Sequence, residues 1–88
     1  MNQTNNDMRK YKVKEYVQTC SACPSQWDIT TTDGHYIYAR YRWGFLSVTI
    51  NPGSKLSETL LGKQIGHDLD GVLSTYELKK LTKDILEW

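Results

Sequence analysis

Residues 27–50, WDITTTDGHYIYARYRWGFLSVTI, decide the fold. Apolar and polar side chains alternate along them, which is typical of strands with one buried face. Asp33-Gly34 marks a hairpin, and its loop length decides which side chains share a face, because a shift of one residue turns every side chain over. A two-residue loop would put Trp27 and Ile29 with polar partners, whereas the three-residue loop Thr32-Asp33-Gly34 puts them beside apolar ones. We therefore predict a type I turn with Gly34 left-handed at a bulge.

The second reversal, at Trp43-Gly44, predicts a two-residue loop that sets Tyr41 opposite Leu46 and Ile37 opposite Ile50. The three strands then share one apolar face, expected to be buried, formed by Trp27, Ile29, Ile37, Ala39, Tyr41, Leu46, Val48 and Ile50. The opposite face carries Asp28, Thr30, Tyr36, Tyr38, Arg40, Arg42, Phe45, Ser47 and Thr49.

Two C-terminal helices are expected to cover the apolar face. Residues 55–65 have Leu56, Leu60, Leu61 and Ile65 at helical spacing, weakened by Gly62. Further on, Ser74-Thr75-Tyr76-Glu77 has the form of a capping box. It opens a second predicted helix that runs to about Glu87, with an apolar stripe of Leu78, Leu81, Ile85 and Trp88.

Residues 1–8 are polar and aperiodic, so a disordered tail is expected. Residues 10–18 alternate, with Tyr11, Val13 and Val17 on one side, and predict a strand that either joins the sheet edge or covers its open face. The whole prediction is a single α+β domain over residues 9–88. It is an antiparallel three-stranded meander, with a fourth N-terminal strand if residues 10–18 pair with it, and two C-terminal helices packed on one face.

Composition argues against several function classes. A chain of 88 residues has little volume for a deep active-site cavity, and a net charge of +1 gives no bulk attraction to nucleic acid or anionic membrane. No apolar run approaches the roughly eighteen residues of a membrane span, and no secretory signal is visible, so a cytoplasmic protein is expected. Neither His35 nor His67 has a spacing that places a nucleophile or carboxylate beside it. We predict a non-enzyme without a cofactor.

Two motifs suggest bound metal or redox chemistry. Cys20-Ser21-Ala22-Cys23 resembles a redox pair or half a zinc site, but no helix follows it, and His35 and His67 alone could complete a zinc site. We expect two packed thiols, with metal binding by them left open. Residues 68–77 resemble most of a calcium loop, but Gly66 stands where the first carboxylate belongs, so a turn without a metal is expected.

The candidate binding residues lie on the open face: Tyr36, Tyr38, Arg40, Arg42, Asp28 and Phe45. Tyrosine and arginine dominate binding hot spots, and they also stack on bases and hold phosphates. Asp28 is expected to neutralise and orient Arg40 diagonally. The alternative is an ordinary solvated face, or one covered by the N-terminal strand.

Three segments together resemble a pattern found in small proteins of bacteriophages and bacteria: residues 23–27 (CPSQW), Asp33-Gly34, and residues 37–44 (IYARYRWG). Residues 69–74 (LDGVLS) are also similar, so the resemblance covers about residues 20–80. Members of this group have no described function, so no residue role carries over. The resemblance implies an accessory gene of phage or mobile-element type, and such genes often encode binders that disarm host systems.

Two functional hypotheses follow. The first is a non-enzymatic binding protein, a phage accessory factor that inhibits a host defence or regulatory protein through the open face. The alternative is a nucleotide or nucleic-acid binding protein that uses the same face, with the tyrosines stacking on bases and the arginines, joined by Lys12 and Lys14, holding phosphates. No membrane partner is expected.

Overall fold

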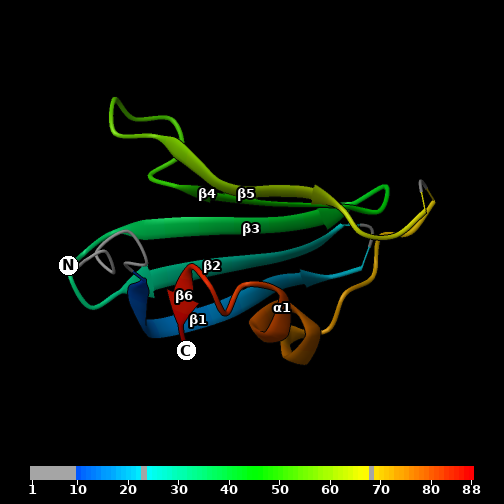
Figure 1. The fold of residues 1–88 in the computed structure, drawn as a ribbon, viewed down its shortest axis with the longest axis horizontal. Coiled ribbons are helices and arrows are strands. Elements are labelled where there is room, and N and C mark those ends of the chain that lie inside the picture. The colour runs from blue at the N-terminus through cyan, green and yellow to red at the C-terminus, as the bar shows by residue number, and fades with distance from the viewer. Residues whose placement is uncertain (1–9, 23, 68) are drawn as a thin grey trace, which may run out of the picture.

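The computed structural model describes residues 10–22, 24–67 and 69–88, which form a curled six-stranded sheet with one short helix (Figure 1). The strands are β1 (Tyr11–Ser21), β2 (Ser25–Thr31), β3 (Tyr36–Arg42), β4 (Phe45–Ile50), β5 (Glu58–Gln64) and β6 (Leu86–Glu87), and the helix is α1 (Thr75–Leu81). The protein is thus mostly β, and the predicted α+β meander with two C-terminal helices is wrong. The expected disordered tail, residues 1–8, lies outside the described residues.

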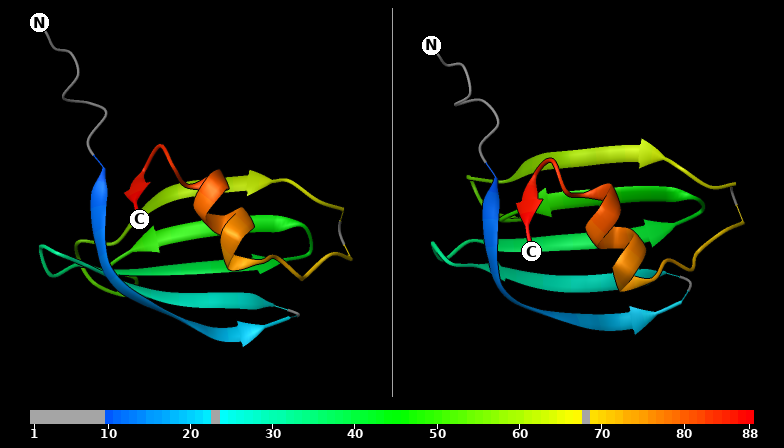
Figure 2. Two further views of the ribbon diagram at one scale, coloured as in Figure 1. Left: turned by 90° about the horizontal axis from the view of Figure 1, so that it is seen from below. Right: turned by 60° about the horizontal axis from the view of Figure 1, so that its bottom comes forward.

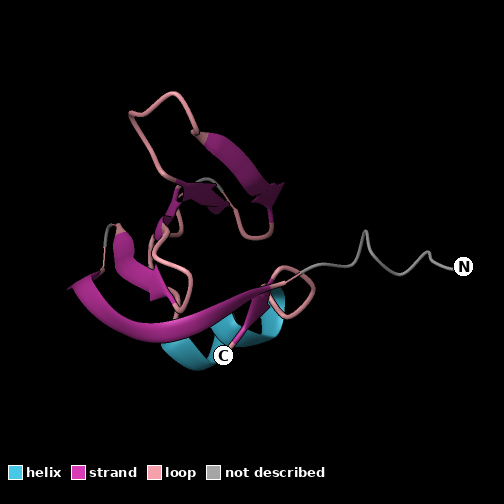
Figure 3. Ribbon diagram, turned by 90° about the vertical axis from the view of Figure 1, so that its left-hand side faces the viewer, coloured by secondary structure: helices cyan, strands magenta, loops and turns pink. Residues whose placement is uncertain are grey.

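The strands follow the order β5-β4-β3-β2-β1-β6. Neighbours are antiparallel except β1 and β6, which pair in parallel. Figure 2 shows α1 crossing one face of the sheet while the first half of β1 bends toward that face to meet β6, and Figure 3 shows the same curl from the end. The sheet therefore has an inner face under α1 and an outer face on the other side.

The central meander has the predicted register. Trp27 pairs with Ala39 across β2 and β3. Gly34 has a φ of 88°, and its N–H donates to the carbonyl of Thr31 (3.1 Å), as the three-residue loop requires. All eight residues predicted for the apolar face are at most 3 % exposed, and Leu73, Leu78 and Leu86 complete the core. The assignment of the two sheet faces is confirmed.

Residues 58–64 form a strand where the sequence pattern predicts a helix. β5 pairs with β4, with Leu61 opposite Val48, so the strand covers an edge of the meander that would otherwise be open. The Phe45 ring lies over Gly62, 3.2 Å from where a Cβ would stand, so glycine fits this strand. Leu56, predicted to face inward, is exposed in the preceding turn.

The capping box starts α1 as predicted, but the helix ends earlier than expected. The Ser74 hydroxyl accepts from the Glu77 N–H (3.0 Å), and the Glu77 carboxylate accepts from the Ser74 N–H (3.2 Å). Thr82 is the C-cap of the helix, and its hydroxyl and backbone N–H both donate to the Leu78 carbonyl (2.7 and 3.0 Å). The chain then turns into β6, and Leu86 takes the buried position that the pattern assigned to Leu81.

β1 joins the sheet edge beside β2 rather than covering the outer face. A register shift between Val13 and Glu15 reverses the alternation, since a bulge adds one residue to the strand. Val17 consequently pairs with Asp28 on the outer face and is exposed, whereas Tyr11 and Val13 pack on the core. The prediction that Tyr11, Val13 and Val17 share one side is therefore wrong beyond the bulge.

We predict that two glycines of similar conformation differ sharply in tolerance. Gly44 and Gly53 have φ of 73° and 82°, but a Cβ on Gly44 would lie 2.3 Å from the Gly66 carbonyl oxygen, whereas Gly53 has open space around it. Gly53→Ala should lower the free energy of unfolding by about 1 kcal/mol through backbone strain alone. Gly44→Ala should cost roughly 3 kcal/mol or more. Equal losses in urea unfolding would contradict this account.

Candidate functional site

The six predicted site residues all lie on the outer face, here called the Tyr/Arg face: Asp28 on β2, Tyr36, Tyr38, Arg40 and Arg42 on β3, and Phe45 on β4. Register brings them together, with Asp28 opposite Tyr38 and Arg42 opposite Phe45. Tyr36 and Phe45 are exposed, and the other four are half-buried. Because β1 lies at the sheet edge, it leaves this face uncovered.

Asp28 is bound by Tyr36 rather than by Arg40. The Tyr36 hydroxyl donates to Asp28 Oδ1 at 2.7 Å, and burial together with this hydrogen bond raises the pKa of Tyr36 to about 12. Among the described residues neither Arg40 nor Arg42 forms an ion pair with a carboxylate. The prediction that Asp28 orients Arg40 is therefore wrong. Asp28 does contact a diagonal neighbour on β3, but that neighbour is Tyr36 and not Arg40.

The two arginines border a hollow on this face. Its volume is about 350 Å³, and its lining consists of Arg40, Arg42, Trp43, Phe45 and Ser47. The Arg42 guanidinium carbon lies 4.4 Å from the centre of the Trp43 ring. Arg40 Nε is buried without a hydrogen-bond partner. A buried donor left unpaired costs stability.

Trp43 is the functional candidate that sequence reasoning missed. It is 59 % exposed and has a φ of 55°, a left-handed conformation that a bulky side chain rarely adopts. A two-residue hairpin loop favours Asn, Asp or Gly at this position, so a tryptophan there was already a sign in the sequence that this residue has a functional role. The fold gains little from an exposed indole on a strained backbone, and such strain is often retained for function.

A neighbouring segment holds the Trp43-Gly44 turn in place. The Gly44 N–H donates to the Asp70 carbonyl (2.7 Å), and the Gln64 side chain donates to the Trp43 carbonyl (3.0 Å). The Asp70 carboxylate accepts from the Tyr41 hydroxyl at 2.6 Å. Burial, followed by this hydrogen bond, raises the pKa of Tyr41 to about 12. These hydrogen bonds to Asp70 and from Gln64 hold the backbone of the turn that carries Trp43.

Asp70, which accepts the hydrogen bond from Gly44, belongs to the segment that resembles a calcium loop. Asp68 lies outside the described residues, and the Asp70 carboxylate is already engaged by Tyr41 and by the Val72 N–H. The hydrogen bond from Tyr41 lowers the pKa of Asp70. A second hollow, of about 140 Å³, lies between this segment and the turn, lined by Arg42, Trp43, Leu69, Asp70 and Gly71. Trp43 therefore borders both hollows.

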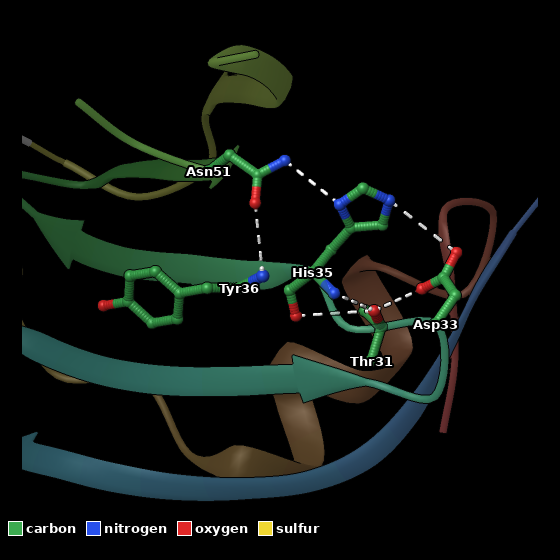
Figure 4. A network of polar contacts seen from close by, with 5 residues as sticks. All are labelled: Thr31, Asp33, His35, Tyr36 and Asn51. Carbon is green, nitrogen blue, oxygen red and sulfur yellow. Dashed lines mark hydrogen bonds and ion pairs between the residues drawn. The ribbon is translucent and has the colours of Figure 1, made fainter. Parts of the chain in front are cut away.

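A polar network closes the opposite end of β3 (Figure 4). His35 Nε2 lies 3.7 Å from Asp33 Oδ2, and its Nδ1 lies 3.1 Å from the Asn51 side-chain nitrogen. The hydrogen bond from the Thr31 hydroxyl lowers the pKa of Asp33. The expectation that no carboxylate lies beside His35 is wrong. Because its partners are turn and strand residues, the network braces the first hairpin and the start of β3.

The cysteine motif is only partly described. Cys20 is half-buried with its Sγ 3.5 Å from the Ala22 carbonyl oxygen, and Cys23 lies outside the described residues. Within the described ranges, no three His, Cys, Asp or Glu side chains lie close enough together to hold a metal ion. The described part of the chain also contains no helix long and apolar enough to cross a membrane.

We predict that Tyr36 and Tyr41 ionise late. Their raised pKa values, about 12 each, mean that the folded state retains both phenolic protons more tightly than the unfolded chain, in which tyrosine ionises near pH 10. The stability they add is complete below about pH 10 and is lost as the pH rises through about 12. Tyrosinate absorbance should show two tyrosines titrating together near pH 12, and Tyr36→Phe should halve this late change. Ionisation of both groups near pH 10 in the native protein would refute this.

Comparison with known proteins gives no assignment. No family model, no curated protein and no solved structure matches this chain. The resemblance to small phage and bacterial proteins therefore stays a prediction.

Proposed function

We propose that this chain is a non-enzymatic binding protein that recognises an acidic surface of another protein through the Tyr/Arg face and Trp43. The observation that carries the proposal is the exposed, left-handed Trp43 with Arg42 stacked on its ring. Trp, Tyr and Arg are the residues that contribute most to protein–protein hot spots. Arg42 and Trp43 are in contact at this end of β3, and Tyr36 and Tyr38 lie farther along the same strand.

The charges of the face support an acidic partner. Arg40 and Arg42 have no carboxylate partner among the described residues. Asp28 on this face is engaged by Tyr36, and Glu15 lies at its β1 side, opposite Thr30. A guanidinium pairs with carboxylates through two parallel hydrogen bonds. An acidic side chain entering the hollow would lie beside both arginines.

A nucleotide or nucleic acid remains the alternative occupant of this face. One feature favours a protein instead. Arg42 already lies on Trp43, which leaves one face of that ring unavailable to a base.

The sequence resemblance supplies the biological setting of the proposal. A small accessory protein of phage or mobile-element type would act in the cytoplasm of the host cell, where it would inhibit a host defence or regulatory protein by occupying its surface. Stoichiometric inhibition of this kind needs a rigid contact surface and no catalytic group.

We predict that Trp43→Asn separates stability from binding. Asparagine adopts the left-handed conformation readily, so the free energy of unfolding should rise by about 1 kcal/mol. Capture of the partner from bacterial host lysate, identified by mass spectrometry with and without nuclease, should nevertheless be lost. Leu56→Asn, at another exposed apolar position, is the matched control and should capture normally. Undiminished capture by Trp43→Asn would reject the proposal.

A second variant tests the arginine row. Tyr38→Ala combined with Arg40→Glu should abolish capture, because a carboxylate then faces the acidic partner. Far-UV circular dichroism should show that the double variant stays folded. A folded double variant that still captures the partner would show that β3 makes no contact with it.

A further inference from the structure

Lysines and aromatic rings converge on the other side of the sheet, where α1, β6 and the start of β1 meet. A hollow of about 480 Å³ there is lined by Lys10, Tyr76, Lys79, Lys80, Lys83, Leu86, Glu87 and Trp88, and is here called the lysine groove. Figure 2 shows α1 over the inner face of the sheet, and the groove is lined by residues of α1, so the groove and the Tyr/Arg face lie on opposite sides. The two surfaces can be tested separately.

The aromatic side of the groove is a fixed framework. Tyr16 and Trp88 meet edge to face with ring centres 5.2 Å apart, and the Trp88 indole N–H donates to the Thr82 hydroxyl (2.9 Å). The Lys79 ammonium lies 5.0 Å from the Tyr16 ring centre and 5.5 Å from that of Trp88. Cation–π contacts of this kind hold the ammonium group in place while leaving it partly hydrated.

The charge of the groove is unbalanced. The lining contains four lysines and one carboxylate: Lys10, Lys79, Lys80 and Lys83, and Glu87. None of these lysines forms an ion pair within the described ranges of the chain. Lysines in the last turn of a helix complement its dipole, which accounts for Lys79 and Lys80. Lys10 lies on the segment leading into β1 and Lys83 beyond the end of α1, so the dipole accounts for neither.

We propose that the lysine groove binds a strand of single-stranded nucleic acid. Four ammonium groups around a groove suit the successive phosphates of one strand, since lysine is a flexible point charge. Tyr76 is 71 % exposed, and the Lys80 ammonium lies 5.3 Å from the centre of its ring, so a base can stack on the other face of the ring. The inference is independent of the proposed protein-binding role of the Tyr/Arg face.

Fluorescence anisotropy with a labelled oligothymidylate of about fifteen nucleotides tests the proposal. Affinity should fall with KCl, with a logarithmic slope of about −3 if four phosphates are neutralised. Lys80→Glu with Lys83→Glu should weaken binding at least about tenfold and flatten the slope. Lys55→Glu with Lys63→Glu makes the same change in net charge away from the groove and should bind like the parent. Absence of binding at low salt, or equal losses in both double variants, would overturn the proposal.

Two further variants locate the site. Tyr76→Ala should weaken binding about five- to hundredfold through lost stacking, with the salt slope unchanged. Trp43→Asn, on the opposite side of the sheet, should bind the oligonucleotide normally. Loss of binding in Trp43→Asn would move the site to the Tyr/Arg face and refute the groove. Displacement of the strand by poly-glutamate at equal charge would show that any polyanion fits, which also overturns the assignment.

Discussion

The pairing of β2 with β3 determines which side of the sheet can hold the helix. It puts the large Trp27 ring opposite the small Ala39, and the Trp27 indole N–H donates to the Thr75 hydroxyl in the first turn of α1 (2.9 Å). One turn of the chain, closed by Gly34, sets this pairing. A shift of one residue would turn Trp27 toward solvent and bring the Tyr/Arg side chains beneath the helix. The length of the loop at Gly34 therefore determines both which side chains form the core and which lie on the outer face.

This dependence explains why the meander could be predicted from the sequence. Residues 27–50 carry a strict alternation, and both loops have glycine where a left-handed residue is required. The capping box at Ser74 was equally legible, because its two hydrogen bonds lie within four consecutive residues. Where an element is determined by contacts between residues close in sequence, the sequence pattern was sufficient to predict it.

The remaining elements depend on partners that a local pattern does not contain. The leucines of residues 55–65 fit a helix as well as a strand, and the open edge of β4 decided between them. The bulge after Val13 has no sequence signature, so the facing of Val17 could not be read. At the site, alternation placed the six residues on one face correctly, but their contacts depend on side-chain reach: Asp28 pairs with Tyr36, and Arg42 lies on Trp43.

The parallel pairing of β1 with β6 joins segments from opposite ends of the described chain, Tyr11 with Leu86 and Lys12 with Glu87. Contacts between neighbouring hairpins close short loops, whereas this one closes almost the whole chain, so we expect it to form last during folding. A two-residue strand with so large a closure entropy should also be the first to detach. The amide of Tyr11, which donates to the Ile85 carbonyl (3.0 Å), would then exchange its hydrogen sooner than those of β3, and the architecture around α1 would open while the meander stays intact.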